Sequence, residues 1–428
     1  MNSKKQILSN FSCAKSQSFC LRPDNEEDLA HYIAHNPQQN LLMRGSGLSY
    51  NDSCFNTNGY VIDSERLNHL IDFDPQTGIV ICQGGVPLKD LFLLNPDFIP
   101  PVIPGTVHAT VAGGIAHDIH GKNNHKAGSF GHHLISFDLL IGNKKIHCNR
   151  NENTDLFHAT IAGLGLTGVI TRASLRLKKT SRFILAKHIP CQSLHELTEL
   201  MLTHGINDDY QVAWLDLLNS KPCAILSIAN HCEPLNIKEY KTYSIPKIPF
   251  SLIRPWNMKL FNRYFFNSKK TEEKLTLEQF NNPLDKIKHW NRLYGPQGLI
   301  QFQAVFDTVN VITILDHLIQ IIRTSNATPT LAVLKLFNRS GDGLLSFCKP
   351  GFTLAVDFIH NSAARQAISS MNQLIIELNG RIYFAKDSLV NEEQYKKMYE
   401  NHAQFSEILK QHACTMHSDL ATRLGITK

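Results

Sequence analysis

Two glycine-rich segments of this 428-residue chain have the composition of loops that bind phosphate groups. Residues 44–50 read RGSGLSY, and residues 104–123 read PGTVHATVAGGIAHDIHGKN. Loops with such small side chains let backbone N–H groups converge on an anion without the help of a helix dipole. Either loop alone is more often a tight turn. Together with a third glycine cluster at residues 163–168, they favour a diphosphate ligand that lies across several loops.

The third cluster, GLGLTG, also fits the G-x-G-x-x-G pattern of dinucleotide-binding folds. That pattern binds a dinucleotide when it follows a strand and opens a helix. Here a helix-like stretch precedes the glycines, and an alternating strand follows from Val169. Since the order is reversed, the sequence argues against a Rossmann-type site.

Several histidines crowd the second segment, which raises the question of a metal site. They are His117, His120, His125, His132 and His133. The nearby glycines make a helical ligand pair doubtful, and no carboxylate-rich partner completes a ligand set. We therefore expect no metal.

Short apolar runs predict the elements that position these loops. In the first 180 residues they predict strands at 60–63, 79–82 and 169–178, a hairpin at 139–148 with a Gly142-Asn143 turn, and helices at 25–35 and 153–162. Later they predict strands at 211–217, 222–229, 299–306, 332–337 and 353–358, and helices at 194–202, 309–324, 362–378 and 392–402. Strands and helices mix without strict alternation, which favours an α+β fold.

Composition narrows the class of protein. Hydrophobic residues make up 43% and charged residues 19%, an ordinary globular balance. The net charge of +6 comes without a block of like charges, which argues against a nucleic-acid binder. No apolar run reaches the roughly eighteen residues of a transmembrane helix. The ten cysteines are scattered singly, so we expect a soluble protein in the reducing cytoplasm.

The segment 244–270 is aromatic and basic and contains no Asp or Glu. Its prolines at 246, 249 and 255 discourage one continuous helix, so we expect a mobile flap. Trp and Tyr favour lipid headgroups and basic residues favour anionic surfaces, so this flap is a candidate for peripheral membrane contact. The alternative is that its aromatic residues fill a domain core.

The glycine loops and later segments resemble a known family. RGSGLSYND (44–52), PGT…GG with DIHGKN…AGSFG (104–131), and GLGLTGVITRASL (163–175) resemble the vanillyl-alcohol-oxidase, or PCMH-type, FAD-binding superfamily. With HWNRLYGPQGLIQFQ (289–303), VLKLFN (333–338) and GRIYFAKDS (380–388), the similarity is closer to the family of decaprenylphosphoryl-β-D-ribose 2-oxidases. It spans nearly the whole chain.

The resemblance implies an FAD site and its residues. The cofactor-binding residues would be Arg44, Gly45, Ser46, Gly47, Leu48, Ser49, Pro104, Gly105, Thr106, Gly113, Gly114, Ala116, His120, Gly121, Asn123, Gly165, Gly168, Val169 and Tyr383. Many relatives carry a flavin-linking histidine immediately before the serine of the first loop. Here that position is Leu48, which has no nucleophile, so FAD should be held noncovalently.

The resemblance also implies a catalytic site in the second half. Lys386, His120 and Lys335 would be the catalytic residues, with Lys386 and His120 both open as the base. The substrate-binding residues would be Tyr50, Lys122, Tyr294, Gln301, Gln303, Lys335, Thr353 and Lys386. On the sequence alone, either lysine could instead point outward from a strand. The relatives carry a cysteine where this chain has Ala355, so this wall of the pocket is altered.

The implied fold has two domains, an FAD-binding domain at 1–185 and an antiparallel-sheet substrate domain at 186–380, with 381–428 returning to the first. The implied reaction oxidises the 2-hydroxyl of a polyprenyl-phosphate-linked pentose to a ketone, and a short-chain reductase would complete an epimerisation. Two alternatives stay open: an aldonolactone or alditol oxidase of the same fold acting on another small sugar, and a non-catalytic flavin-binding protein.

Overall fold

A four-stranded sheet near the N-terminus carries the first glycine-rich segment. The computed structural model describes residues 2–219, 222–234 and 241–427. The sheet order is β1-β2-β4-β3, and helix α1 is capped at its N-terminus by Asn25, whose side chain accepts a hydrogen bond from Asp28 N. The bounds are β1 Lys4–Ser9, β2 Lys15–Leu21, α1 Glu26–His35, β3 Leu41–Arg44 and β4 Tyr60–Asp63. Because β3 ends at Arg44, the glycine loop leaves the sheet at the end of a buried strand.

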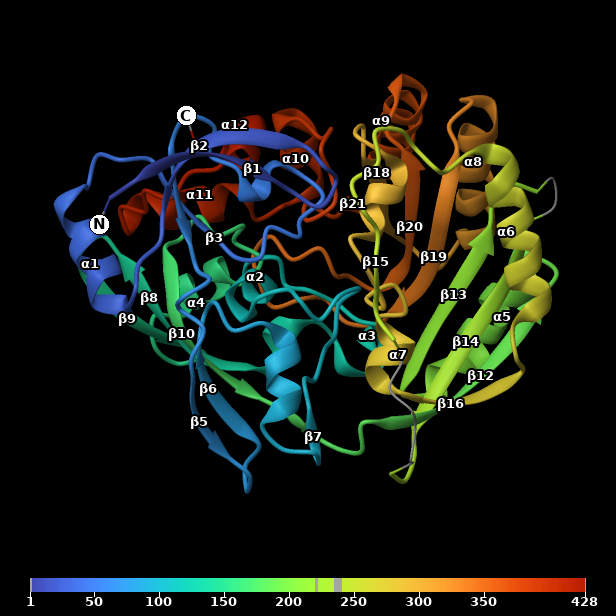
Figure 1. Cartoon of the computed structure of the whole chain (residues 1–428), viewed down its shortest axis with the longest axis horizontal. Helices are drawn as coiled ribbons and strands as arrows, with labels where there is room; N and C mark the ends of the chain where they lie inside the picture. Colours follow the sequence, from blue (N-terminus) through green and yellow to red (C-terminus); the bar gives the residue numbers. More distant parts are fainter. Residues whose placement is uncertain (1, 220–221, 235–240, 428) are drawn as a thin grey trace.

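A five-stranded antiparallel sheet of order β5-β6-β10-β8-β9 carries the second and third glycine segments (Figure 1). Its strands are β5 Leu70–Asp74, β6 Ile79–Gln83, β8 Leu134–Ile141, β9 Lys144–Asn149 and β10 Val169–Arg176. Its loops hold α2 Val111–Ala116, α3 Asn124–Ala127, α4 Thr154–Thr160 and the paired short strands β7 Phe98–Ile99 and β11 Lys178–Lys179. The short 3-10 helices are η1 Asp52–Cys54, η2 Leu88–Leu93 and η3 Phe130–His133.

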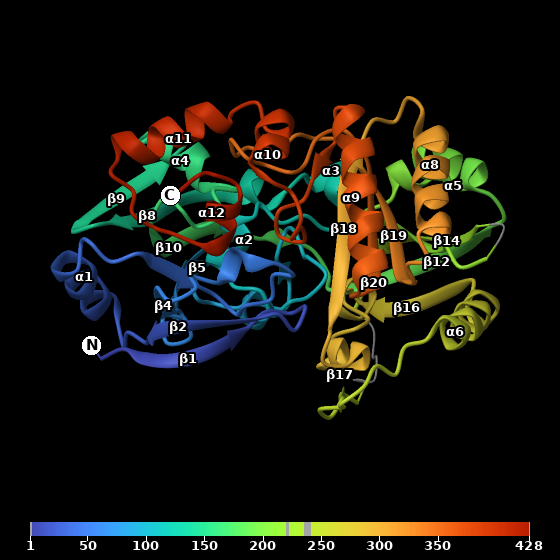
Figure 2. The ribbon, with the colours of Figure 1, turned by 90° about the horizontal axis from the view of Figure 1, so that it is seen from above.

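An eight-stranded sheet of order β16-β12-β14-β13-β19-β20-β18-β21 forms the other half of the molecule. Its strands are β12 Phe183–Cys191, β13 Tyr210–Asp216, β14 Cys223–His231, β16 Glu272–Thr276, β18 Leu299–Phe306, β19 Pro329–Phe337, β20 Gly351–Ile359 and β21 Arg381–Ile382. Helices α5 Leu194–Thr203, α8 Val311–Thr324 and α9 Ser362–Glu377 cover one face (Figure 2). Phe302, Leu318 and Met371 lie in one buried cluster, which joins this face to its helices.

The opposite side of this sheet carries helix α6 Pro255–Ser268 (Figure 2). The remaining elements are η4 Gly205–Asn207, β15 Tyr243–Ser244, α7 Leu277–Asn281, β17 Ile287–Lys288 and η5 Trp290–Tyr294. Among the helices of the described residues, none is long and apolar enough to cross a membrane.

The last helices return to the first half of the chain. They are α10 Glu392–Met398, α11 His402–Gln411 and α12 Asp419–Arg423, and Figure 1 shows them beside the N-terminal strands. His417 N donates to Leu41 O over 2.8 Å, and Asp419 N donates to Phe55 O over 2.9 Å. The C-terminal segment therefore completes the layer that holds the first glycine loop.

The predicted mixture of helices with antiparallel sheets is confirmed, and so are the hairpin and the reversed order around 163–168. One predicted helix is wrong, and one observed helix was not predicted. A single helix at 392–402 is interrupted because Tyr399 leaves the helix, is buried, and donates its hydroxyl to Ile382 O over 2.8 Å. Within 244–270, no single helix spans the segment, as expected, but residues 255–268 form a helix that the sequence did not predict, because Pro255 occupies the first helical position, where proline is favoured; the expected mobility of the segment stays a prediction. The domain boundaries at 185 and 380 stay predictions.

Candidate active site

The first glycine loop presents a row of unused backbone donors. None of the N–H groups from Gly45 to Ser49 donates a hydrogen bond to a residue that the structure describes. Gly47 adopts a φ of +65°, in the left-handed region that favours glycine. The Arg44 guanidinium folds back beneath the loop and donates to Ser9 O over 2.7 Å. Successive unpaired N–H groups in a loop are suited to bind an anion.

The second segment lies directly against the first. Ser46 Oγ donates to His108 O over 2.7 Å, and a Cβ on Gly45 would come within 2.5 Å of Thr110 Oγ1. Gly105 is exposed, and a Cβ placed there would meet nothing within 4 Å. The neighbouring Thr106 donates its hydroxyl to Asp285 Oδ2 over 3.2 Å, and Asn282 Nδ2 donates to Pro104 O over 2.7 Å. The two loops thus form one open surface lined by small residues.

The third cluster contacts the second segment through its backbone. Leu164 N donates to Ala116 O over 2.9 Å, and Gly165 is open to its surroundings. A Cβ on Gly168 would come within 2.7 Å of Leu140 O, and Val169 is fully buried in the core. Gly165 is therefore better placed to face a ligand than Gly168 and Val169, and the cofactor assignments of Ala116, Gly165, Gly168 and Val169 stay predictions.

Tight packing shapes the second segment around its other glycines. A Cβ on Gly113 would lie 3.0 Å from Thr110 Oγ1, one on Gly114 would lie 3.1 Å from Ile119, and one on Gly121 would lie 2.9 Å from Ile103 O. Several buried polar atoms here have no partner among the described residues: His117 Nε2, His120 Nδ1, Asn123 Oδ1 and Asn124 Oδ1. Buried polar atoms are normally satisfied, so these atoms indicate a polar group that completes the site.

Strand register brings the predicted polar residues of the second half onto one sheet face. On β18 and β20, Gln301 lies opposite Asp357 and Gln303 lies opposite Ala355. On β19 and β20, Lys335 lies opposite Thr353. Residues directly opposite in antiparallel strands share a face. These strands therefore present a row of amide, carboxyl, hydroxyl and ammonium groups on the face away from α8 and α9.

His120 lies against this row in an aromatic enclosure. Gln303 Nε2 is 2.9 Å from His120 Nε2 and 3.4 Å from Thr353 Oγ1. The ring is surrounded by Phe337, Phe347 and Tyr383, with centroids 4.9 to 5.5 Å away. Burial, together with repulsion from nearby lysines, holds the pKa of His120 well below its ordinary value. An amide NH2 only donates, so Nε2 of this neutral ring accepts and the ring proton resides on Nδ1.

Lys386 follows β21 on a turn and lies over the ring of Tyr50, with Nζ 3.3 Å from the ring centroid. Burial lowers the pKa of Lys386 to about 7, while Asp357 opposes the shift and Lys335 adds to it. Burial raises the pKa of Asp357 to about 6. Gln301 Nε2 donates to Asp357 Oδ1, but Oδ2 has no hydrogen-bond partner among the described residues. Asp357 and Lys386 thus both have pKa values shifted toward neutrality, which is typical of groups at functional sites.

Two further buried lysines, Lys335 and Lys122, lie in the same part of the molecule. Burial lowers the pKa of Lys335 to about 8, and burial with repulsion from Lys335 lowers the pKa of Lys122 to about 7. Lys122 Nζ donates to Phe280 O and lies 4.5 Å from the Phe280 ring centroid. Within the described residues, neither Lys335 nor Lys386 donates a hydrogen bond through Nζ. The amino groups of Lys335 and Lys386 are therefore available to interact with a ligand in the site.

The two predicted tyrosines of the pocket are tied to the protein. Tyr294 shares a 2.6 Å hydrogen bond with Thr330 Oγ1 and is buried. Tyr383 OH donates to His117 O over 3.3 Å, and its ring stacks on Phe347 at 4.7 Å. Both rings therefore act as walls, and their roles in binding stay predictions.

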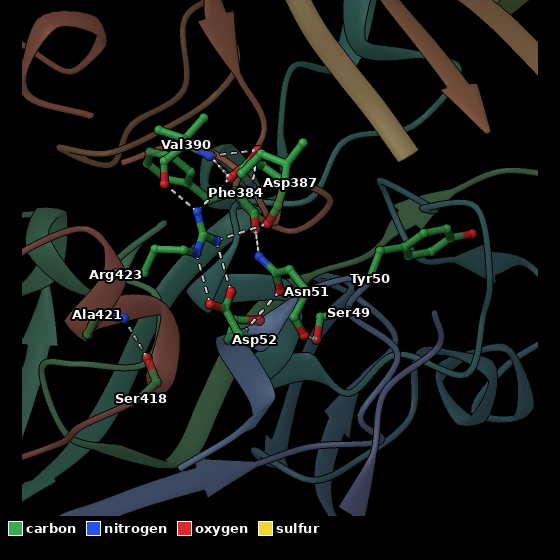
Figure 3. A network of polar contacts seen from close by, with 12 residues as sticks. Ser49, Tyr50, Asn51, Asp52, Phe384, Asp387, Val390, Ser418, Ala421 and Arg423 are labelled. Carbon is green, nitrogen blue, oxygen red and sulfur yellow. Dashed lines mark hydrogen bonds and ion pairs between the residues drawn. The ribbon is translucent and has the colours of Figure 1, made fainter. Parts of the chain in front are cut away.

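A polar network joins the first glycine loop to the turn of Lys386 (Figure 3). Arg423 donates to both Asp52 oxygens over 2.9 Å and to Asp387 Oδ2 over 2.9 Å. Asn51 Nδ2 donates to Phe384 O, and Tyr50 N donates to Ala385 O over 3.1 Å. Tyr50 and Lys386 are thus fixed together by contacts on both sides. Sequence reasoning missed Arg423, Asp52 and Asp387.

Comparison with known proteins identifies the type of site. Residues 18–148 match the model of an FAD binding domain. Decaprenylphosphoryl-β-D-ribose oxidase of Mycolicibacterium smegmatis is 33% identical over 383 residues, which cover 84% of this chain and 83% of that protein. The chain belongs to the decaprenylphosphoryl-β-D-ribose oxidase family. It is an FAD-dependent oxidoreductase.

Other relatives of this family member are more distant. An uncharacterised protein of Streptomyces coelicolor is 26% identical over 76% of this chain and 95% of its own length. A putative D-arabinono-1,4-lactone oxidase of Neurospora crassa is 24% identical over 36% of this chain and 29% of its own length. The similarity to lactone oxidases is therefore confined to part of the chain.

The residues present fit FAD. The unpaired N–H groups of 45–49, the open backbone at Gly105 and the unsatisfied polar atoms of 117–124 would hold its polar parts. FAD supplies the two-electron acceptor for the oxidation.

Asp357 is the site residue that sequence reasoning missed although a signal existed. Thr353, Ala355 and Asp357 alternate along one strand, and an acid on a buried strand face is costly unless it has a function.

Proposed function

We propose that the chain oxidises the 2-hydroxyl of a polyprenyl-phosphate-linked pentose to a ketone, the first half of an epimerisation. The observation that carries this proposal is the row of Gln301, Gln303 and Lys335 facing Lys386 and His120, in a chain of the decaprenylphosphoryl-β-D-ribose oxidase family. Amides and ammonium groups in one enclosed row are suited to orient the hydroxyls of a sugar.

Lys386 is the better candidate for the base that accepts the hydroxyl proton. Its pKa, lowered to about 7 by burial, leaves a substantial neutral fraction at neutral pH. His120 accepts from Gln303 through Nε2, so its remaining nitrogen carries a proton and cannot accept another. His120 would instead position Gln303. Lys335, mostly cationic at pH 7 with a pKa lowered to about 8 by burial, would stabilise negative charge that develops in the site.

The wider proposal concerns architecture and partners. An FAD-binding domain and a substrate domain would meet at the site, in the two-domain PCMH-type arrangement. The ketone product needs a reductase to complete an epimerisation, and a short-chain reductase is the expected partner. We also propose a cytoplasmic location with peripheral membrane contact through residues 244–270, which would give access to a lipid-linked substrate.

Anaerobic bleaching of the flavin absorbance tests the function. Short-chain polyprenylphosphoryl ribose in detergent should bleach the holoprotein, whereas aldonolactones and alditols should not. Lys386→Met should bleach at least a hundredfold more slowly with flavin still bound, and the exposed Lys397→Met should match the parent. Bleaching by lactones or polyols alone would establish the alternative oxidase, and bleaching by no sugar would favour the non-catalytic protein.

A further inference from the structure

Helix α6 buries a polar side chain and exposes its large apolar side chains. Its only fully buried residue is Asn262, whereas large apolar side chains of the same helix face outward. Their exposed fractions are 66% for Trp256, 61% for Leu260, 51% for Phe261 and 71% for Tyr264. A helix of a water-soluble domain normally buries its apolar stripe. The exposed stripe therefore indicates a surface that something else covers.

The exposed residues are arranged in sectors around the helix axis. At about 100° per residue, Trp256, Leu260 and Tyr264 fall within an arc of about 80°. Lys259 and Arg263 border one side of this arc, and neither forms an ion pair with a residue that the structure describes. This arrangement of an apolar arc with a basic border is typical of helices that lie in the headgroup region of a bilayer.

The approach to the helix continues the same surface. Phe250 and Leu252 are exposed at 56% and 44%, and Lys247 and Arg254 lie exposed among them. From Tyr243 to Lys270 the sequence contains no Asp or Glu. An acidic protein partner would suit the basic residues but not the aromatic arc. An anionic bilayer complements both.

Helix α6 is attached to the sheet face that carries the active site. Asn262 Nδ2 donates to Asp216 Oδ1 over 2.7 Å, and the Phe265 ring lies 5.0 Å from Trp214. Trp214 lies opposite Val333 on β19, and Val333 lies opposite Ala355 on β20. The same face holds the polar row of the active site, so the exposed arc and the site share one side of the sheet.

Apolar residues connect the helix with the catalytic lysine. Ile253 and Met258 pack in one cluster with Tyr294, Trp290 and Tyr50. The Tyr50 ring is the surface on which Lys386 Nζ lies. Apolar side chains in contact with one another therefore connect the inner side of α6 with Tyr50, the ring on which Lys386 lies.

We propose that α6, with residues 250–254, docks on a bilayer rich in anionic lipid, and that the apolar cluster beneath it guides the prenyl chain toward Lys386. This inference rests on the proposed lipid-linked substrate. It assigns the membrane contact expected of residues 244–270 to a helix with a defined apolar arc. The charge on the arc predicts that binding weakens at high salt, because surface attractions are screened.

Vesicle co-sedimentation of the full-length holoprotein tests the charge contribution. The parent should bind phosphatidylcholine vesicles that contain about 30% phosphatidylglycerol, because this lipid supplies anionic charge. It should bind vesicles of pure phosphatidylcholine poorly. Lys259→Glu with Arg263→Glu should reduce binding by about tenfold or more, since each basic side chain near an anionic surface contributes to attraction. The control variant carries Lys397→Glu and Lys410→Glu at exposed positions of other helices. It changes the net charge by the same amount as the α6 variant and should bind vesicles like the parent.

A second variant tests the apolar arc. Trp256→Ser with Leu260→Ser and Tyr264→Ser should lose vesicle binding while flavin content and thermal stability are retained, because all three side chains are exposed. If both α6 variants sediment with vesicles as the parent does, the proposal is overturned. A parent that binds no vesicles but dissociates from dimer to monomer when the arc is changed would assign the arc to a second copy.

Turnover separates this proposal from the proposed function. With a lipid-linked sugar embedded in vesicles, the α6 variants should lose turnover in proportion to binding. With the same sugar in detergent, they should turn over like the parent. Absence of turnover in both forms, with vesicle binding intact, would refute the substrate but leave the docking surface standing.

Discussion

Replacing Asp357 by Asn tests whether neutral Lys386 is the base. Asp357 is fully buried, and its charge opposes the lowering of the Lys386 pKa by burial. Its Oδ1 already accepts from Gln301, so Asn keeps the shape and the acceptor while removing the charge. A nearby opposite charge typically moves a pKa by about 1–3 units. Without it, the Lys386 pKa falls below its present value of about 7.

The direction of the activity change follows from the protonation state required. A base must be unprotonated, so activity in the parent rises as the pH passes upward through the pKa of Lys386. In Asp357→Asn that rise should move to lower pH by about 1 unit, the low end of the expected range because Asp357 is itself partly protonated near pH 6. Because the two groups interact, the parent's rise reports the pair, whereas the variant's rise reports Lys386 alone.

The assay is the pH dependence of kcat/KM for flavin reduction between pH 5 and 9, with roughly half-unit steps to resolve a one-unit shift. Lys386→Met should remove the rise and lower the rate by about a hundred- to ten-thousandfold. Asp97→Asn, on an exposed loop, serves as the matched control. An unchanged profile in Asp357→Asn, or a rise displaced to higher pH, would refute the assignment of Lys386 as the base.

Three other predictions concern the cofactor and the stability of the site. Acid or heat should release the flavin into the supernatant because Leu48 offers no nucleophile, and flavin retained on the precipitated chain would contradict this. Burial lowers the pKa of Lys386, so the folded protein is destabilised progressively as pH falls from about 10 to about 7, where the unfolded chain binds the proton more readily. The Tm of Lys386→Met should therefore exceed that of the parent by an amount that grows as pH falls through this window. A Tm difference between variant and parent that does not change with pH would disprove the burial effect. Arg423→Met should destabilise the protein by about 3–5 kcal/mol in chemical denaturation, because it strands the buried Asp387; adding Asp387→Asn should recover part of that loss, and purely additive losses would count against the network.

Local patterns predicted most of the secondary structure that frames the site. The strands at 60–63 and 299–306 and the hairpin at 139–148 follow from apolar runs and a Gly-Asn turn, and all three form. The glycine loops were identifiable because runs of small residues contribute little to a hydrophobic core but let backbone N–H groups approach an anion. The row on β18, β19 and β20 was identifiable residue by residue, but its register depends on pairing between strands that are distant in sequence.

The misses have separate physical causes. Helix α6 has no apolar period facing the core because its buried side holds Asn262, so the usual signal is absent. The break at Tyr399 results from tertiary packing against Phe384, with ring centroids 4.6 Å apart. Arg423 pairs with Asp52 across 371 positions of sequence, and no local pattern foretells such a contact.

The Arg423 contacts have a consequence for how the enzyme folds during translation. Residues 44–52 leave the exit tunnel early, yet the guanidinium that ties them to the turn of Lys386 is synthesised hundreds of residues later. The ion pairs of Arg423 with Asp52 and Asp387 therefore form only after translation has passed residue 423, whereas the contacts of Tyr50 and Asn51 with the Lys386 turn can form earlier. A nascent chain that bound the cofactor before then would lack the ion-pair tie between the first glycine loop and the turn of Lys386.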